Sequence, residues 1–348
     1  MKIKSMLIAS AASLFTVSGA VAADAVVAVD PEPAEYVQIC DAYEGFYMIP
    51  GSEVCLDISG RVRVQFDYNS VVRDFEQDVD MRIDFDARHE TEWGTVRSFI
   101  RIGNGLVNGA PVSIATNAAG AVTGVSLFGG VSVERAFISV QPNENVTITT
   151  GRAGSLYYRE EIDSNQIKFQ YAGNGFALGL AYEDAALSGP NTKSFGGAND
   201  AIIGQVSYSA SGFSIYGELA YEGREAGATV TTYAANIGAG YDGGNWDIGV
   251  EYEWFRGASA FEVVGCPAGK LDELAIILGV DITDKLTASS DWDYYGNNQG
   301  WAVANTLAYS VSSNFSVEAE LDYTSRRARS ATATVGVWEL GLDFVATF

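Results

Sequence analysis

The sequence contains a single histidine, His89, within the stretch "ARHETEW". A histidine beside a serine or cysteine nucleophile is the usual arrangement for hydrolysis through a covalent intermediate. No such pair is visible around His89, which falls where a short turn between two β-strands is expected. We therefore predict a solvated or interfacial histidine and no enzyme activity. A hydrolase built on a membrane barrel, with His89 as its base, is the alternative.

The first residues, "MKIKSMLIASAASLFTVSGAVAA", combine Lys2 and Lys4 with an apolar stretch and the small residues Ala20 and Ala22. This order is typical of a cleaved export signal, which we predict to span 1–22. The protein is therefore expected to leave the cytoplasm. Beyond this segment no run of about 18 apolar residues occurs, so no transmembrane helix is expected in the mature chain.

Three cysteines are present. Cys40 and Cys55 lie close together in a region rich in turn residues, and an exported protein meets an oxidising compartment, which favours a disulfide between them. Cys266, in "EVVGCPAGK", has no neighbouring cysteine or histidine and is expected to be a plain loop residue. We predict no metal site and no cofactor.

The chain carries 44 acidic and 21 basic residues, a formal net charge of −23. A charge of this sign argues against a nucleic-acid partner. It is compatible with an ordinary acidic surface. It would also bias a water-filled pore toward cations.

The elements that position these charges are β-strands. In "VWELGLDFVATF", the residues Trp338, Leu340, Leu342, Phe344, Ala346 and Phe348 alternate with a largely polar set. A period of two puts the two sets on opposite faces of a strand. The same pattern recurs in "CLDISGRVRVQFDY", "FSIYGELAYE", "WDIGVEYEW" and "FSVEAELDY". Between Leu56 and Phe348 we count roughly sixteen strand runs, an even number.

Short turn sequences such as "AGNG", "SASG" and "DGGN" alternate with longer connections that have no sustained period. Aromatic residues also stand near both ends of many apolar faces, as in the pairs Phe176 and Tyr182, Phe213 and Tyr221, Trp246 and Trp254, and Phe315 and Tyr323. This placement is typical of strands that cross a membrane, because aromatic side chains are favoured at both membrane–water interfaces. A soluble β-sandwich would alternate too, but it would direct its polar faces outward.

A sheet in lipid satisfies all its backbone groups only by closing on itself. The last strand is therefore expected to meet the first, with its apolar face toward acyl chains and Phe348 at an interface. Roughly sixteen strands leave an interior too wide for side chains to fill, so the polar faces would line an aqueous channel.

With these features in place, the sequence resembles the general diffusion porins of the alphaproteobacterial outer membrane. The resemblance is carried by the N-terminal block through "EYVQICDAYEGFYMIPGSEVCLDISGRVRVQFDY", by "HETEWGTVRS" and "TTGRAGS", and by the final aromatic residue. It implies an all-β fold, a 16-stranded antiparallel transmembrane β-barrel with short periplasmic turns, long external loops and an inward-folded third external loop. It divides the chain into a signal peptide (1–22), an N-terminal periplasmic or inner segment (23–55) and the barrel (56–348).

The resemblance also assigns residues. The third loop matches "LYYREEIDSNQ", so Arg159, Glu160, Glu161 and Asp163 are expected at the pore constriction. Facing them, a basic wall is implied, with Arg61, Arg63, Arg82, Arg97 and Arg101 as inward candidates and Arg152 at the base of the loop. The pair Cys40 and Cys55 matches the family's N-terminal segment. The alternative for Arg61 and Arg63 is simple pairing with Asp80, Asp84 and Asp86 on the adjoining strand.

These features predict an outer-membrane porin, a water-filled channel for passive diffusion of small hydrophilic solutes and ions with a weak cation preference. The expected partners are outer-membrane lipid, lipopolysaccharide and two further copies in a homotrimer. The alternative function is a plugged outer-membrane barrel that acts as an adhesin or receptor through its long external loops.

Overall fold

The computed structural model describes residues 38–103, 113–116, 122–126, 132–157, 163–184, 200–222, 232–256, 270–296, 299–325 and 335–348. Within these ranges the regular structure is β-strand. No helix among the described residues is both long enough and apolar enough to cross a bilayer.

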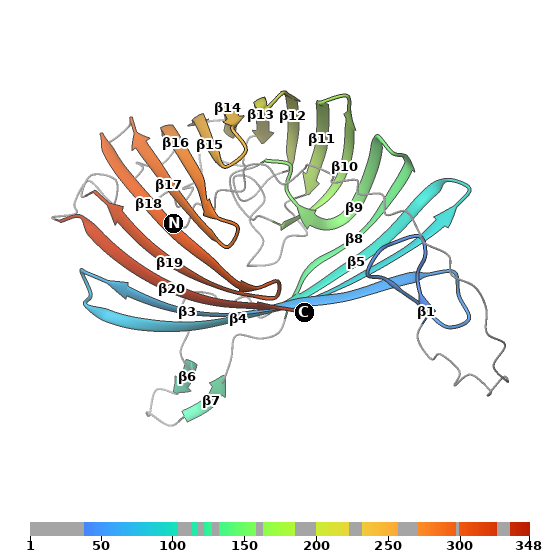
Figure 1. Cartoon of the computed structure of the whole chain (residues 1–348), viewed down its shortest axis with the longest axis horizontal. Helices are drawn as coiled ribbons and strands as arrows, with labels where there is room; N and C mark the ends of the chain where they lie inside the picture. The colour runs from blue at the N-terminus through green and yellow to red at the C-terminus, as the bar shows by residue number, and fades with distance from the viewer. Residues whose placement is uncertain are drawn as a thin grey trace.

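Sixteen strands of the described residues form one closed antiparallel barrel (Figure 1). Each strand pairs with the next, and the last pairs with the first through the register that aligns Phe344 with Val64. The barrel is therefore the closed sheet that the sequence predicted. Its strands are β3 (Cys55–Asn69), β4 (Asp74–Thr91), β5 (Gly94–Gly103), β8 (Ser132–Asn143), β9 (Val146–Gly154), β10 (Asp163–Gly173), β11 (Phe176–Asp184), β12 (Ala201–Ala210), β13 (Phe213–Glu222), β14 (Thr232–Asp242), β15 (Trp246–Arg256), β16 (Lys270–Thr283), β17 (Leu286–Tyr295), β18 (Gly300–Ser312), β19 (Phe315–Thr324) and β20 (Val337–Thr347).

Four short strands lie outside the ring. The strands β1 (Gln38–Ile39) and β2 (Tyr47–Met48) pair with each other and continue onto the start of β3. The strands β6 (Ser113–Thr116) and β7 (Val122–Ser126) form a separate hairpin in the connection between β5 and β8.

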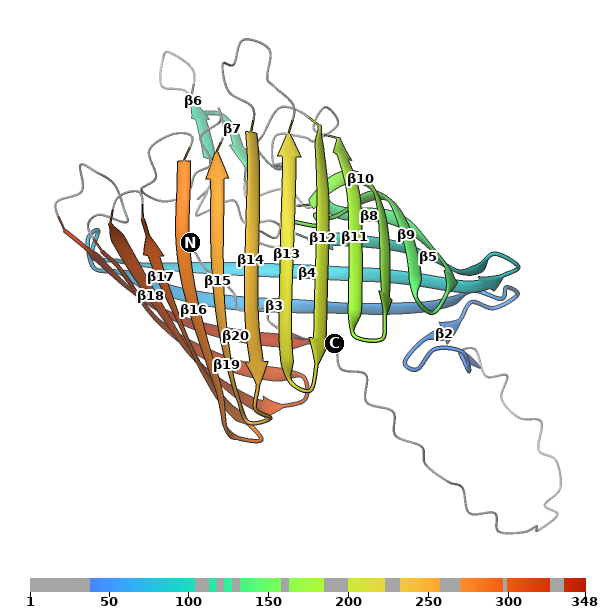
Figure 2. The ribbon, with the colours of Figure 1, turned by 90° about the horizontal axis from the view of Figure 1, so that it is seen from above.

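Short turns join the strands at one end of the barrel, as Figure 2 shows between β12 and β13 and between β14 and β15. By residue number, most connections at the other end are longer. Two connections on the long side are exceptions. The connection from Asn69 to Asp74 and the one from Tyr295 to Gly300 are each only four residues long. The first of them is held locally, because the Asn69 side chain accepts backbone hydrogen bonds from Val71 and Val72.

The two faces of each strand differ as the alternation predicts. On the outer face Leu180, Ile237 and Leu340 are each more than half exposed. On the opposite face of the same strands, Glu183 and Asn236 are almost fully buried. An exposed apolar belt around a closed sheet is the surface that lipid requires.

Aromatic residues mark both edges of this belt. At the end with the long connections, Tyr323 contacts Trp301 and Trp338 on the two neighbouring strands, with ring centroids 4.8 and 4.6 Å apart. At the end with the short turns, Phe213 contacts Tyr241, with ring centroids 4.5 Å apart. Such girdles are typical of two membrane interfaces.

Phe348 lies at the junction between the last and first strands. Its backbone N–H donates to the Gly60 carbonyl at 3.1 Å, and its own carbonyl accepts from the Gly60 N–H at 2.9 Å. The Phe348 ring occupies the space that a Cβ at position 60 would need, since the nearest ring carbon would lie 2.3 Å from that Cβ. The glycine therefore permits the close approach of the terminal aromatic ring.

The face assignment can be checked on two adjacent residues of β16. Ile276→Arg places a charge in the outer belt and should destabilise the folded barrel by about 2 to 4 kcal/mol if it lies near the membrane midplane. Ala275→Arg points inward, where its register neighbours are Glu251 and Asp293, and should leave folding nearly unchanged. The measurement is denaturant-dependent folding into lipid vesicles. Equal destabilisation by the two variants would contradict the assignment.

Candidate pore lining

One stretch of the inner wall, formed by β3, β4, β5 and β8, carries interleaved arginines and aspartates. Arg61 donates to Asp80 at 2.6 Å, and Arg101 donates to Asp84 at 2.6 Å. Between them in sequence, Asp86 accepts from Arg88 at 2.6 Å and from Arg97 at 2.9 Å. These pairs link positions on the same or adjacent strands, so much of the positive charge is compensated within the wall.

Two further arginines of the predicted basic set extend this network. Arg63 lies 3.9 Å from Asp80 and 3.8 Å from Asp343 across the closing junction. Arg82 lies 3.3 Å from Glu134 on β8. The pairing of Arg61 and Arg63 with Asp80 therefore corresponds to the alternative that the sequence left open for them. Their role in lining the pore stays a prediction.

Arg152 is placed differently from the other five predicted arginines. The register aligns it with Ala136 and Asn165, in the same phase as the exposed residue Ile148. The buried neighbours Thr149 and Ala153 occupy the opposite phase. The register therefore places Arg152 in the outward phase, and its position at the base of the third loop stays a prediction. The segment "TTGRAGS" lacks the apolar alternation that fixes the phase of other strands.

Asp163 is the one predicted constriction residue that the structure describes. It accepts a hydrogen bond of 2.7 Å from Arg135 on β8. The sequence left the direction of Arg135 open, and its register position opposite Arg101 places it on the inner face. Arg159, Glu160 and Glu161 lie outside the described residues.

The wall formed by β11 to β20 has a different charge balance. In the described part of these strands, no arginine or lysine shares the inward phase. Inward carboxylates are numerous and mostly buried: Glu183, Glu218, Glu253, Glu273, Asp291, Asp293 and Asp343. The described strands of this wall therefore add many inward carboxylates and no inward arginine or lysine of their own, although Arg63 of β3 lies 3.8 Å from Asp343. Opposite the arginine–carboxylate pairs of β3, β4, β5 and β8, this wall gives the interior an asymmetric negative potential.

The first residues after β9 contact this acidic wall across the interior. Glu183 accepts hydrogen bonds from the Ser155 hydroxyl at 2.6 Å and from the Leu156 N–H at 3.3 Å. The Tyr157 hydroxyl donates to Glu253 on β15 at 2.8 Å. Because β9 and β15 are not neighbours in the sheet, this contact brings distant parts of the ring together.

Two of these residues, Leu156 and Tyr157, also belong to an apolar cluster on the inner wall. Leu156 and Tyr157 pack with Phe255, Tyr295, Ile203 and the alanines at 181, 201, 220 and 234. Sequence reasoning did not identify Tyr157, Glu183 or Glu253. The sequence pattern that could have revealed this contact is a set of apolar residues at inward positions of neighbouring strands, where polar residues were expected.

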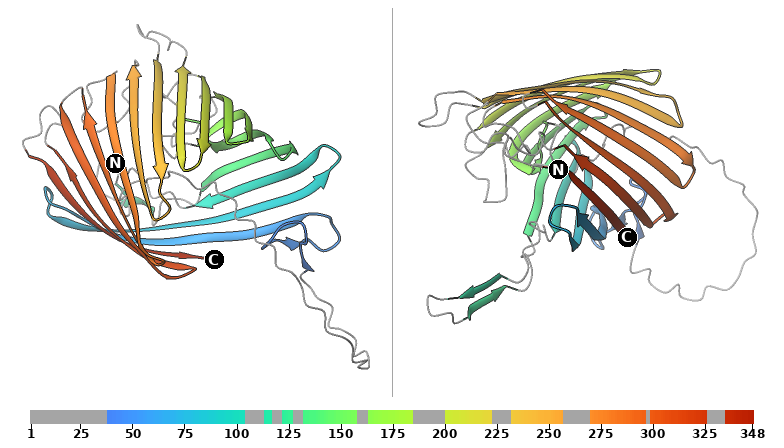
Figure 3. Two further views of the ribbon diagram at one scale, coloured as in Figure 1. Left: turned by 45° about the horizontal axis from the view of Figure 1, so that its top comes forward. Right: turned by 90° about the vertical axis from the view of Figure 1, so that its left-hand side faces the viewer.

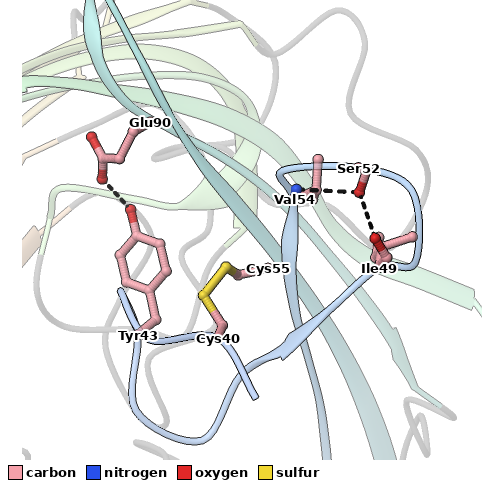
Figure 4. The surroundings of a disulfide bond; sticks show 7 residues. All are labelled: Cys40, Tyr43, Ile49, Ser52, Val54, Cys55 and Glu90. Carbon is pink, nitrogen blue, oxygen red and sulfur yellow. Dashed lines mark hydrogen bonds between the residues drawn. A yellow bond between two sulfur atoms is a disulfide. The ribbon is translucent and has the colours of Figure 1, made fainter. Parts of the chain in front are cut away.

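The structure joins Cys40 and Cys55 in the predicted disulfide, with Cα atoms 5.8 Å apart (Figure 4). Both cysteines and Phe46 are buried together, and the Arg88 guanidinium lies 4.8 Å from the centre of the Phe46 ring. The Tyr43 hydroxyl donates to Glu90 at the end of β4. Burial, followed by this hydrogen bond to the Glu90 carboxylate, raises the pKa of Tyr43 above its usual value. The disulfide-bonded segment is thus attached to the end of the β3–β4 hairpin.

One inward group has a donor set that a divalent cation could use. Carboxylate oxygens of Glu318, Glu320 and Asp343 lie within 4.8 Å of one another. The Arg63 guanidinium, 3.8 Å from Asp343, already supplies positive charge beside them. This position therefore gives no independent indication of a metal.

A closed antiparallel barrel with an apolar outer belt and a charged interior defines a transmembrane β-barrel channel. The family model described as "Porin subfamily" matches residues 24–342. The chain therefore belongs to the porin family, is located in the outer membrane and forms a passive diffusion channel. The family points to a channel rather than an enzyme.

Individual relatives agree with this assignment. Porin Omp2b of Brucella melitensis is 27% identical over 349 aligned residues, which cover 93% of both chains. The OmpF structure from Salmonella typhi, in complex with daunomycin, matches with a TM-score of 0.66 at 14% identity and covers 86% of this chain and 99% of its own. The trimer form of OmpT from Vibrio cholerae matches with a TM-score of 0.59 at 12% identity, over 85% of this chain and 100% of its own.

Removing the disulfide tests whether the N-terminal segment depends on it. In the double variant Cys40→Ser/Cys55→Ser, we expect the barrel to keep its heat-modifiable gel mobility, because its strands pair independently of the disulfide. The segment from 41 to 54 should become accessible to chymotrypsin, since two of the three buried residues in its cluster are the cysteines themselves. Cys266→Ser is the matched control. Loss of the folded barrel in the double variant would contradict this separation.

Proposed function

We propose that the channel passes small hydrophilic solutes and ions with a weak preference for cations. This proposal rests on the balance of positive and negative charges among the described residues that face the interior of the barrel. The arginines of β3, β4, β5 and β8 are paired with carboxylates, whereas the described strands β11 to β20 contribute inward carboxylates and no inward arginine or lysine of their own. A permeating cation would therefore be concentrated along the acidic wall without tight binding.

We further propose that the connection between β9 and β10 folds inward as the third external loop and narrows the pore. The contacts of Leu156 and Tyr157 with the inner wall support this path. Arg159, Glu160, Glu161 and Asp163 would then stand at the constriction, opposite Arg61, Arg63, Arg82, Arg97 and Arg101. Arg152 is left out of this set because of its register.

The remaining assignments are also proposals. Residues 1–22 act as a cleaved signal peptide, 23–55 as a periplasmic or inner segment, and 56–348 as the barrel. Short turns face the periplasm, and long connections face outward, where acidic loops contact lipopolysaccharide through divalent cations. The trimer form of a structural relative supports a homotrimer.

Planar-bilayer recordings test the function directly. The purified protein should give conductance steps in groups of three that increase linearly with salt concentration. In a potassium chloride gradient the reversal potential should have the sign of cation preference and should shift toward zero in Glu160→Gln/Glu161→Gln. Glu92→Gln, in a short turn, is the matched control. Anion preference in the wild type would contradict the proposal, as would silence from protein shown to be folded.

The position of the third connection has its own test. Tyr157→Phe removes the hydroxyl that donates to Glu253 and should cost about 1 kcal/mol of local stability. We expect more frequent brief current fluctuations, because the connection is held less firmly, with unchanged heat-modifiable mobility. Tyr252→Phe, on the outer face of β15, is the control. Current noise equal to the wild type in both variants would contradict an inward, hydrogen-bonded connection.

A further inference from the structure

A groove crosses the outer face of the barrel over β15 to β20, the wall seen in the right-hand view of Figure 3. Its volume is about 660 Å³, within the usual range of small-molecule sites. The lining is mainly apolar and includes Trp246, Val280, Leu307 and Leu340. The groove is therefore continuous with the apolar belt that faces lipid.

The depression arises from small residues in the middle of this wall. Ala288 and Ser290 of β17 and Ala319 of β19 contribute outward side chains to it. Ser290 donates to Asn305 at 2.9 Å, and Asn305 donates to the Leu321 carbonyl at 3.2 Å. The two polar side chains thus bond to each other and to the backbone, so an apolar occupant leaves these hydrogen bonds intact.

The groove extends toward the short-turn end of the barrel, because Trp246 and Ala288 lie near the starts of β15 and β17. All seven short turns between barrel strands belong to the described residues. Across them Lys285 is the one basic residue. Its ammonium group lies 3.5 Å from the carbonyl of Val311, two residues beyond the outward ring of Tyr309. Lys285 therefore supplies a positive charge at the short-turn end of the wall that carries the groove, beside Asp284 of the same turn.

We propose that this groove binds one anionic glycerophospholipid of the periplasmic leaflet. An acyl chain lies against Val280, Ala288 and Leu307, and the headgroup phosphate pairs with Lys285. Charge complementarity favours an anionic headgroup, since a cationic side chain at an interface attracts anionic lipid. Tyr309 and Trp246 flank the site at the depth where amphipathic rings are stable. The leaflet rests on the proposed orientation, in which the short turns face the periplasm.

Native mass spectrometry of the detergent-solubilised full-length barrel tests the site with defined lipids. Phosphatidylglycerol and phosphatidylcholine of identical acyl composition are added in equal amounts. We expect one phosphatidylglycerol per chain to survive collisional activation with at least a tenfold preference over phosphatidylcholine. Lys285→Gln should remove the headgroup preference, and Ala288→Phe should reduce retention of both lipids by filling the groove.

Two matched controls separate the site from general effects. Asp284→Asn changes the neighbouring charge in the same turn, and Ala239→Phe adds the same ring to the outer face of β14, where Ala239 is exposed. Both should retain the lipid as the wild type does.

Equal retention in all variants would overturn the proposal. So would a lower trimer-to-monomer ratio in Ala288→Phe with unchanged lipid retention, since a second copy would then cover the groove. Bilayer conductance of each variant should match the wild type, which separates failure here from failure of the channel function.

Discussion

The structure depends on the pairing of the last strand with the first. In the hydrocarbon of a membrane, an unpaired backbone N–H or C=O costs several kcal/mol, and an open sheet would expose two rows of them. The register between β20 and β3 removes both edges, and the mutual hydrogen bonds of Gly60 and Phe348 extend it. The outward apolar faces and the enclosed polar interior are possible only because this junction is closed.

Within the closed ring, the two parts of the inner wall use charge in different ways. Arginines and aspartates of β3, β4, β5 and β8 compensate one another at hydrogen-bond distance, as Arg61 with Asp80 and Arg101 with Asp84 show. On the opposite part, Glu183 and Glu253 instead accept hydrogen bonds from residues that follow β9. The same carboxylates that make the interior negative therefore also position a connecting segment.

The strands and their outward faces could be predicted because lipid imposes a strict period of two, which is plain in the strand that contains Leu340 and Leu342. The disulfide between Cys40 and Cys55 could also be predicted, because an exported protein meets an oxidising compartment and the two cysteines lie close together in the sequence. The face of Arg152 could not be derived from the sequence, because the glycine and threonine residues around it give no apolar phase. The direction of Arg135 could not be decided from the sequence, because Arg135 and the apolar Phe137 lie on the same face of the strand. In the structure this face points inward, where Phe137 stacks on Phe99 with ring centroids 5.1 Å apart. The contact between Tyr157 and Glu253 depends on the curvature of the whole ring, which no local pattern encodes.

The disulfide also has a mechanical consequence. Cys55 is the first residue of β3, and Cys40 precedes the segment that the bond closes. A pulling force applied to the chain before residue 40 would pass through the sulfur–sulfur bond directly into β3, bypassing 41–54. That segment would carry no tension, and its small cluster would not need to resist unravelling. The load would instead be shared along the β3–β4 hairpin, whose strands of 15 and 18 residues are the longest in the described barrel.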